Sequence, residues 1–113
     1  METTIKGQPI YSTEPVRPGF EELLVEYVSE LPAAAAALRE LVAADAELEC
    51  EESLHRLAGS LGLYGYGQME QYCRTYLLRL RTGEPINGMA NAILEFSDQL
   101  LKVRARPQNN HLA

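Results

Sequence analysis

His55 is the residue of this sequence best suited to carry chemistry, because histidine has a neutral, nucleophilic form near neutral pH. The second histidine, His111, lies near the end of the sequence, where we expect it to be solvated. A zinc site is not expected at His55, because no second histidine or cysteine lies at a ligand spacing on the same helix face. A hydrolytic triad is not expected either, because a single convex helical face offers no oxyanion hole.

The spacing of apolar residues around His55 predicts that its side chain points away from the core. Those residues repeat at helical intervals and are Cys50, Leu54, Leu57 and Leu61. At about 100° per residue, they centre at about 230° from His55. The imidazole is therefore expected to face solvent.

Acidic residues and glycines share the helix face of His55. The residues on that face are Leu48, Glu51, Glu52, Gly59 and Gly62. Each glycine costs roughly 0.5–1 kcal/mol relative to alanine inside a helix. Two glycines on one exposed face therefore favour a role other than stability, such as letting another surface approach the imidazole closely. The alternative is that Gly62 begins the helix end and His55 is an ordinary surface residue.

Four amphipathic helices are predicted to position this face, near residues 20–42, 46–63, 67–82 and 86–105. The stripe of the first helix is Phe20, Leu24, Tyr27, Leu31, Ala34, Leu38 and Leu41. The stripe of the third is Met69, Cys73, Tyr76 and Leu80, and that of the fourth is Ile86, Met89, Ile93, Phe96, Leu100 and Val103. Pro32 predicts a kink or a short break in the first helix, and Asp45 is expected to cap the second.

The predicted fold class is all-α, an antiparallel up-down-up-down four-helix bundle with an extended N-terminal arm. No segment alternates as a strand would. Prolines and glycines prevent a long helix in residues 1–19, so we expect this segment to be the arm. It is expected to be ordered where Ile10 and Tyr11 touch the bundle. Residues 20–105 form the bundle, and residues 106–113 are expected to be a frayed C-terminal tail.

Composition narrows the class of protein. A chain of 113 residues predicts a single domain, and 16 acidic against 10 basic residues give a net charge of -6. A nucleic-acid binder would need a basic face, so that class is disfavoured. No apolar run approaches the roughly 20 residues needed to cross a bilayer, so no membrane association is expected. Cys50 and Cys73 are expected to be buried free thiols, which places the protein in the cytoplasm.

The stretch from Leu54 to Gly65 resembles the signature of histidine-containing phosphotransfer (HPt) domains. That signature has a histidine, a leucine two residues on, lysine-glycine-serine at three to five residues on, and a glycine ten residues on. The matching residues are His55, Leu57, Gly59, Ser60 and Gly65. The resemblance covers roughly residues 20–104, which is nearly all of the predicted bundle.

Ala58 departs from the family pattern, which has a lysine there, close to the phosphorylated imidazole. By the same angular arithmetic Ala58 lies at about 300°, between the core and His55. A lysine in its place is therefore expected to change stability by no more than about 0.5 kcal/mol. Arg56 on the other flank would partly supply the missing charge, or it is a solvated surface residue.

The resemblance implies a carrier that takes a phosphoryl group from a receiver-domain aspartate and passes it to another. His55 would be the phosphoacceptor, through Nε2, with Leu48, Leu63 and Tyr64 as a contact rim. Alternatively, Tyr64 and Tyr66 close the end of the bundle, and Ser60 bonds back to a helix carbonyl or holds the loop. The partners would be a response-regulator receiver domain, a hybrid histidine kinase or both, with the carrier a monomer.

A carrier of this kind is not a kinase, because it needs no ATP site, nucleotide or metal of its own. The Mg²⁺ would belong to the partner receiver. Two alternatives stay open. An HPt-like docking module would regulate a kinase or receiver without efficient transfer, which Ala58 favours. An unrelated four-helix scaffold would carry the motif by coincidence.

Overall fold

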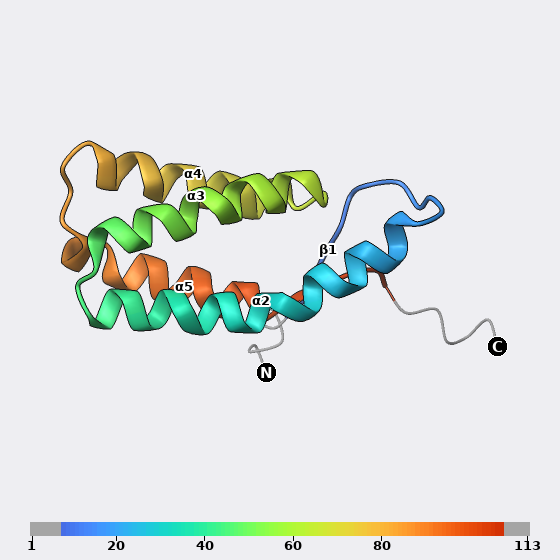
Figure 1. Ribbon diagram of the computed structural model, residues 1–113, viewed down its shortest axis with the longest axis horizontal. Coiled ribbons are helices and arrows are strands. Elements are labelled where there is room, and N and C mark those ends of the chain that lie inside the picture. The colour runs from blue at the N-terminus through green and yellow to red at the C-terminus, as the bar shows by residue number, and fades with distance from the viewer. Residues whose placement is uncertain (1–7, 108–113) are drawn as a thin grey trace.

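The computed structural model describes residues 8–107, most of which form four α-helices (Figure 1). The elements are β1 (Ile10–Tyr11), α2 (Phe20–Ala43), α3 (Glu47–Leu63), α4 (Gly67–Arg81), the 3₁₀ turn η1 (Ile86–Met89), α5 (Ala90–Leu100) and β2 (Val103–Arg104). The expectation of a mostly helical, four-helix domain is confirmed. His111 and the outer parts of the arm and tail lie outside the described residues.

The helices pack as two pairs around one apolar core. α3 lies against α4, and α2 lies against α5 (Figure 1). Buried positions on α3 and along the last stretch match the predicted stripes: Cys50, Leu54, Leu57 and Leu61, then Ile86, Met89, Ile93, Phe96, Leu100 and Val103. In α2 the buried residues are Leu24, Leu31, Ala35, Leu38 and Val42. The periodicity of the sequence therefore predicted the core face well, with small shifts along α2.

α2 runs without a break through Pro32. Proline removes a backbone donor and crowds the carbonyl of Val28, which bends a helix without ending it when neighbours hold both halves. Figure 1 shows the bend in the blue and cyan part of α2. The kink alternative is therefore correct, and the short break is not present.

Two predictions about helix ends need correction. The fourth helix does not run from 86 to 105: residues 86–89 form a 3₁₀ turn, and the helix ends at Leu100. Val103 then leaves the helix because its backbone pairs with the arm. Asp45 does not cap α3 with its side chain. Its φ of 57° closes the turn before Ala46, a conformation that aspartate tolerates better than most residues.

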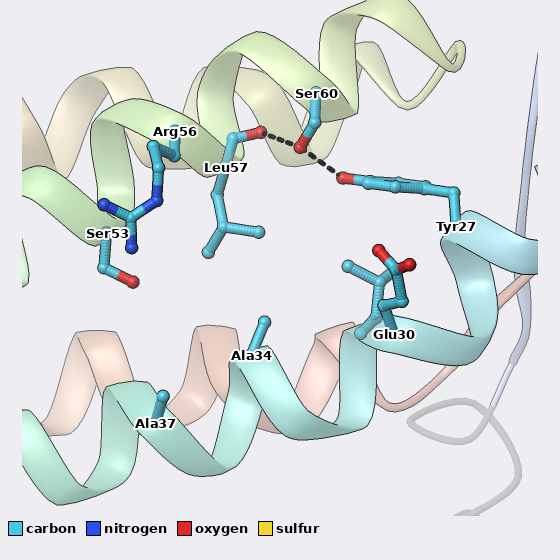
Figure 2. A pocket seen from close by; sticks show the side chains of 9 residues that line it. Tyr27, Glu30, Ala34, Ala37, Ser53, Arg56, Leu57 and Ser60 are labelled. Carbon is cyan, nitrogen blue, oxygen red and sulfur yellow. Dashed lines mark hydrogen bonds between the residues drawn. The ribbon is translucent and has the colours of Figure 1, made fainter.

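α2 and α3 leave a groove of about 430 Å³ between them (Figure 2). Ala34 and Ala37 of α2 approach this groove opposite Ser53 and Leu57 of α3. Small side chains on α2 cannot fill the space between the two helices, so α3 keeps closer contact with α4 than with α2.

The expectation that the chain holds no strand is wrong, because the structure has two short strands. β1 and β2 pair in parallel, with Ile10 opposite Val103 and Tyr11 opposite Arg104. The Ile10 amide also donates to the Lys102 carbonyl at 3.0 Å. A pairing of two residues per strand has no periodicity for a sequence pattern to reveal.

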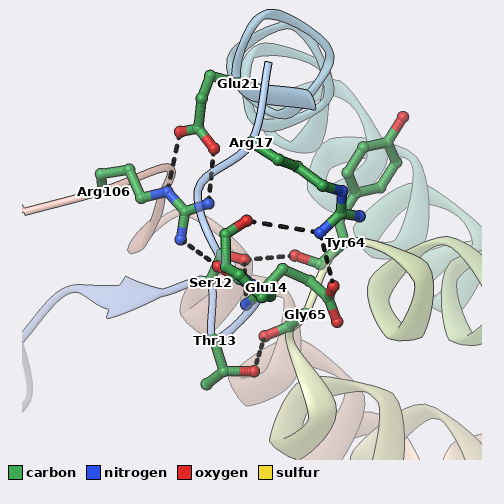
Figure 3. Close-up of polar contacts among 9 residues, drawn as sticks. Ser12, Thr13, Glu14, Arg17, Glu21, Tyr64, Gly65 and Arg106 are labelled. Carbon is green, nitrogen blue, oxygen red and sulfur yellow. Dashed lines mark hydrogen bonds and ion pairs between the residues drawn. The ribbon is translucent and has the colours of Figure 1, made fainter. Parts of the chain in front are cut away.

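Hydrogen bonds tie residues 12–14 to the turn between α3 and α4 (Figure 3). The Ser12 hydroxyl donates to the Tyr64 carbonyl at 2.6 Å. The Thr13 amide and hydroxyl both donate to the Gly65 carbonyl, at 2.9 and 3.0 Å. This part of the N-terminal segment therefore covers the same turn that ends the HPt-like stretch.

Arg106 binds the arm and α2 together, so the expected frayed tail does not begin at residue 106. Its guanidinium donates to both carboxylate oxygens of Glu21, at 2.9 and 2.7 Å, and to the Glu14 carbonyl at 2.6 Å (Figure 3). The Glu21 side chain lies in the first turn of α2. The pKa of Glu21 is lowered, mainly because Arg106 donates hydrogen bonds to the ionised carboxylate.

Gly65 is required by the local backbone. Its φ is +89°, and a Cβ there would lie 2.6 Å from the Ser12 hydroxyl oxygen and 2.8 Å from the Glu14 amide nitrogen. Both the turn conformation and the approach of the arm therefore exclude a side chain. The last glycine of the HPt-like stretch has a structural explanation at the far end of α3.

Candidate functional site

His55 lies exposed on α3, off the buried face of that helix. The four core residues predicted from its spacing are buried, which confirms the angular argument. The imidazole borders a shallow hollow of about 290 Å³ on the outer side of α3 and α4. The residues lining the hollow are Leu48, Glu51, Glu52, His55, Arg56 and Arg81. Five of these were expected from the sequence, and Arg81 was not.

Arg81 reaches the hollow from the last turn of α4. Its Nε lies 3.7 Å from Oε1 of Glu51, which forms an ion pair between the two helices. Because α3 and α4 are joined by a short turn, residues late in α4 lie opposite residues early in α3. That register was the signal in the sequence that could have placed Arg81 beside His55.

The two glycines near His55 differ in their surroundings. A Cβ added at Gly59 would meet nothing within 4 Å, so this helix surface is open one turn from the imidazole. A Cβ added at Gly62 would lie 2.7 Å from a carboxylate oxygen of Glu70, which reaches across from α4. Glu70 is itself paired with Arg74 at 2.7 Å. Only Gly59 therefore leaves an uncovered surface beside His55.

Ala58 was expected near the surface, but it is buried, with an exposed fraction of 0%. The angular estimate failed because α4 covers this flank of α3, which widens the buried face beyond the apolar stripe. A longer side chain at this position would displace packed atoms, a change that typically costs about 1–3 kcal/mol. The burial of Ala58 therefore predicts that Ala58→Lys destabilises the protein, in place of the neutral change expected from its angular position.

Ser60 lies in the groove between α2 and α3 rather than in the His55 hollow (Figure 2). Its hydroxyl donates to the Leu57 carbonyl at 3.3 Å and lies 2.6 Å from the Tyr27 hydroxyl. Burial raises the pKa of Tyr27 to about 12, so the phenol stays protonated and can donate to Ser60. Ser60 therefore bonds back to its helix and links α3 to α2.

Exposed leucines lie on both helices that border the His55 hollow. Leu48 and Leu63 are exposed at the two ends of α3, and Leu78 is exposed on α4. Tyr64 does not join this rim, because its ring stacks on Tyr27 at 4.3 Å. The Tyr66 side chain is buried and donates to the Arg104 carbonyl at 2.7 Å. Both tyrosines therefore close the end of the bundle, and Leu78 is an addition that the sequence did not indicate.

The two cysteines are buried in the core. Cys50 and Cys73 are buried and free, as expected. Burial raises the pKa of Cys50 to about 11 and that of Cys73 to about 12, so both stay as unreactive thiols. Among residues 8–107 no group of three metal-ligating side chains is present. No helix in that range is long and apolar enough to span a bilayer.

Comparison with known proteins identifies the family. The family model described as "Hpt domain" matches residues 22–105 of the 113-residue chain. No curated protein and no solved structure matches the chain. The matched range includes α2 from residue 22 onward, the whole of α3, α4 and α5, His55 and the residues of its hollow. Hpt domains transfer phosphoryl groups on histidine in phosphorelays, act as carriers rather than kinases, and interact with receiver domains and histidine kinases. The chain belongs to the Hpt domain family.

Proposed function

We propose that this protein carries a phosphoryl group on His55 between receiver-domain aspartates in a two-component phosphorelay. The observation that carries the proposal is the exposed imidazole beside the uncovered helix surface at Gly59. Gly59 has no close neighbour inside the protein, so the fold itself does not exclude a side chain there. A partner that must come within bonding distance of His55 would be obstructed by a side chain at this position, and this explains the glycine.

The transfer step requires little from the carrier. A nitrogen of the neutral His55 imidazole, Nε2, attacks phosphorus as the O–P bond of the aspartyl phosphate breaks. The aspartate departs as a carboxylate while the other ring nitrogen keeps its proton, so no general base is needed. The receiver contributes Mg²⁺ and its own charged residues. The same step in reverse passes the phosphoryl group to a second aspartate.

The receiver is proposed to dock on the outer face of α3 and α4. Leu48, Leu63 and Leu78 supply exposed apolar contacts around the site. Gly59 lets the partner backbone approach, since reacting atoms must come within about 3–3.5 Å. Such a face combines an apolar rim with a polar centre, an arrangement common at transient interfaces.

The same proposal includes the topology of the bundle, the oligomeric state of the carrier and its location in the cell. The four helices alternate in direction as an antiparallel up-down-up-down bundle, and residues 8–19 form an arm along it. The carrier acts as a monomer, without a nucleotide or metal site of its own. The two free buried thiols are in keeping with a cytoplasmic location.

Phosphotransfer from charged receivers tests the proposal. The protein is mixed with receiver domains labelled by acetyl phosphate, and with hybrid histidine kinases and ATP. The expected product is an adduct that is labile in acid, stable in alkali and located at His55 by peptide mass spectrometry. Receiver binding without any such adduct would contradict the carrier and indicate a docking module instead.

A further inference from the structure

A phosphoryl group on His55 would meet an unfavourable local field. Two carboxylates, Glu51 and Glu52, line the same hollow as the imidazole. A phosphoryl dianion placed among them gains stability only if a cation lies within a few ångströms. Ala58 is buried and apolar, so it supplies no charge. The cation has to come from another position.

Two arginines border the hollow, and they differ in orientation. Arg56 also lines the groove between α2 and α3, and Figure 2 shows its guanidinium turned toward Ser53 in that groove. Arg81 enters from α4 and lies on the side of Glu51. Arg81 is therefore the cation that the fold directs to the His55 side.

We propose that Arg81 binds the phosphoryl group on His55 and supplies, from α4, the positive charge that Ala58 cannot. This inference rests on the proposed function of His55. In the unphosphorylated protein Arg81 pairs with Glu51, at an N–O distance of 3.7 Å and with 53% of the arginine side chain exposed. An ion pair at this distance with a half-exposed arginine is worth little, so its exchange for a better partner is easy.

The phosphoryl group is that better partner. It carries up to two negative charges and three acceptor oxygens, and the planar guanidinium matches them with parallel donors. Glu51 holds Arg81 at the edge of the hollow before transfer and releases it when the dianion arrives. Arg81 is thus a phosphoryl-binding residue whose contact exists only in the phosphorylated carrier.

Chemical phosphorylation tests this contact without any receiver. Phosphoramidate donates its phosphoryl group to the imidazole: its N–P bond breaks, a new N–P bond forms at His55, and ammonia leaves. The pKa of the phosphorylated imidazole ring is then read from a ³¹P NMR titration around neutral pH, where the adduct survives. A guanidinium bound to the phosphoryl group disfavours protonation of the ring, so Arg81→Ala is expected to raise that pKa by about half a pH unit. Arg81→Lys is expected to keep most of the wild-type value.

Arg74→Ala is the matched control. Arg74 lies on the same helix, is 51% exposed and pairs with Glu70 four residues earlier, but it does not line the hollow. Its removal is expected to leave the pKa of the phosphorylated imidazole ring unchanged. Circular dichroism of the unphosphorylated variants checks that each still folds.

The outcomes separate the two claims. If His55 of the wild type takes no phosphoryl group, the proposed function fails and this inference falls with it. If the wild type is labelled but Arg81→Ala titrates like the wild type, only the inference is overturned. An equal rise in Arg74→Ala, or a rise in Arg56→Ala alone, would also overturn it.

Discussion

The role of Gly59 can be tested at the level of a single residue. Since no atom lies within 4 Å of a Cβ at this position, Gly59→Ala is expected to stabilise the protein by about 0.5–1 kcal/mol through helix propensity. Gly59→Leu is expected to fold as well but to lose receiver binding and transfer, because its side chain fills the approach to His55. Urea denaturation and a receiver-binding titration measure the two effects.

The receiver affinity of Gly59→Leu decides whether the partner docks at this face. Unchanged receiver affinity in Gly59→Leu would mean that the partner docks elsewhere. Gly62→Ala is a useful comparison, because the nearest atoms to its added carbon are those of the flexible Glu70 carboxylate. It therefore probes packing between α3 and α4 rather than the approach of a partner.

For single residues, the sequence predicted exposure well at the centres of the helix faces and poorly at positions between two faces. His55 and Leu57 lie at the centres of the polar and apolar faces, where helical periodicity alone decides exposure. Ala58 lies between these faces, where exposure depends on which neighbouring helix covers that flank. Arg81 is brought to the site by the pairing of α3 with α4 through their short turn, and helical periodicity within one helix does not reveal that pairing.

The ion pair between Arg106 and Glu21 of α2 joins two elements of the fold, and its contribution to stability is expected to depend on pH. Arg106 lowers the pKa of Glu21 below its ordinary value of 4.5, so the pair stabilises the fold where Glu21 is ionised. That contribution is present above pH 4.5 and is lost as the pH falls through the lowered pKa. Arg106→Gln is therefore expected to lower the melting temperature at pH 7 and to have progressively less effect below pH 4.5.

A second variant identifies the partner in this effect. In a Glu21→Gln background, the pH dependence of the Arg106→Gln effect is expected to disappear, leaving only the loss of the bond to the Glu14 carbonyl. A melting-temperature difference between wild type and Arg106→Gln that is the same at pH 7 and pH 3 would contradict this account.

Element boundaries were predictable where the signal is repeated and not where it depends on distant partners. The glycines after Leu61 correctly indicated the end of α3, because Gly65 adopts a left-handed backbone. The sequence could not indicate that Val103 would leave the helix to pair with Ile10, since that pairing joins segments from opposite ends of the chain. The apolar pattern nevertheless predicted Val103 as buried, which it is in either conformation.

At the scale of the whole molecule, stability depends on one core to which both helix pairs contribute. Leu57 and Phe96 are buried on different pairs, so Leu57→Ala and Phe96→Ala are each expected to cost about 2–5 kcal/mol. Chemical denaturation followed by circular dichroism measures both losses. A cost near zero for both would show that the apolar stripes do not form the core. Leu78→Ala serves as the exposed control and is expected to change stability by about 0.5 kcal/mol or less.

The central claim is that His55 alone accepts the phosphoryl group. The most direct measurement compares phosphoryl labelling of the wild type, His55→Gln and His111→Gln by the same charged receiver. His55 is exposed and off the core, so His55→Gln is expected to abolish labelling while its helical spectrum matches the wild type. His111→Gln is expected to label normally. Normal labelling of a folded His55→Gln protein would contradict the account.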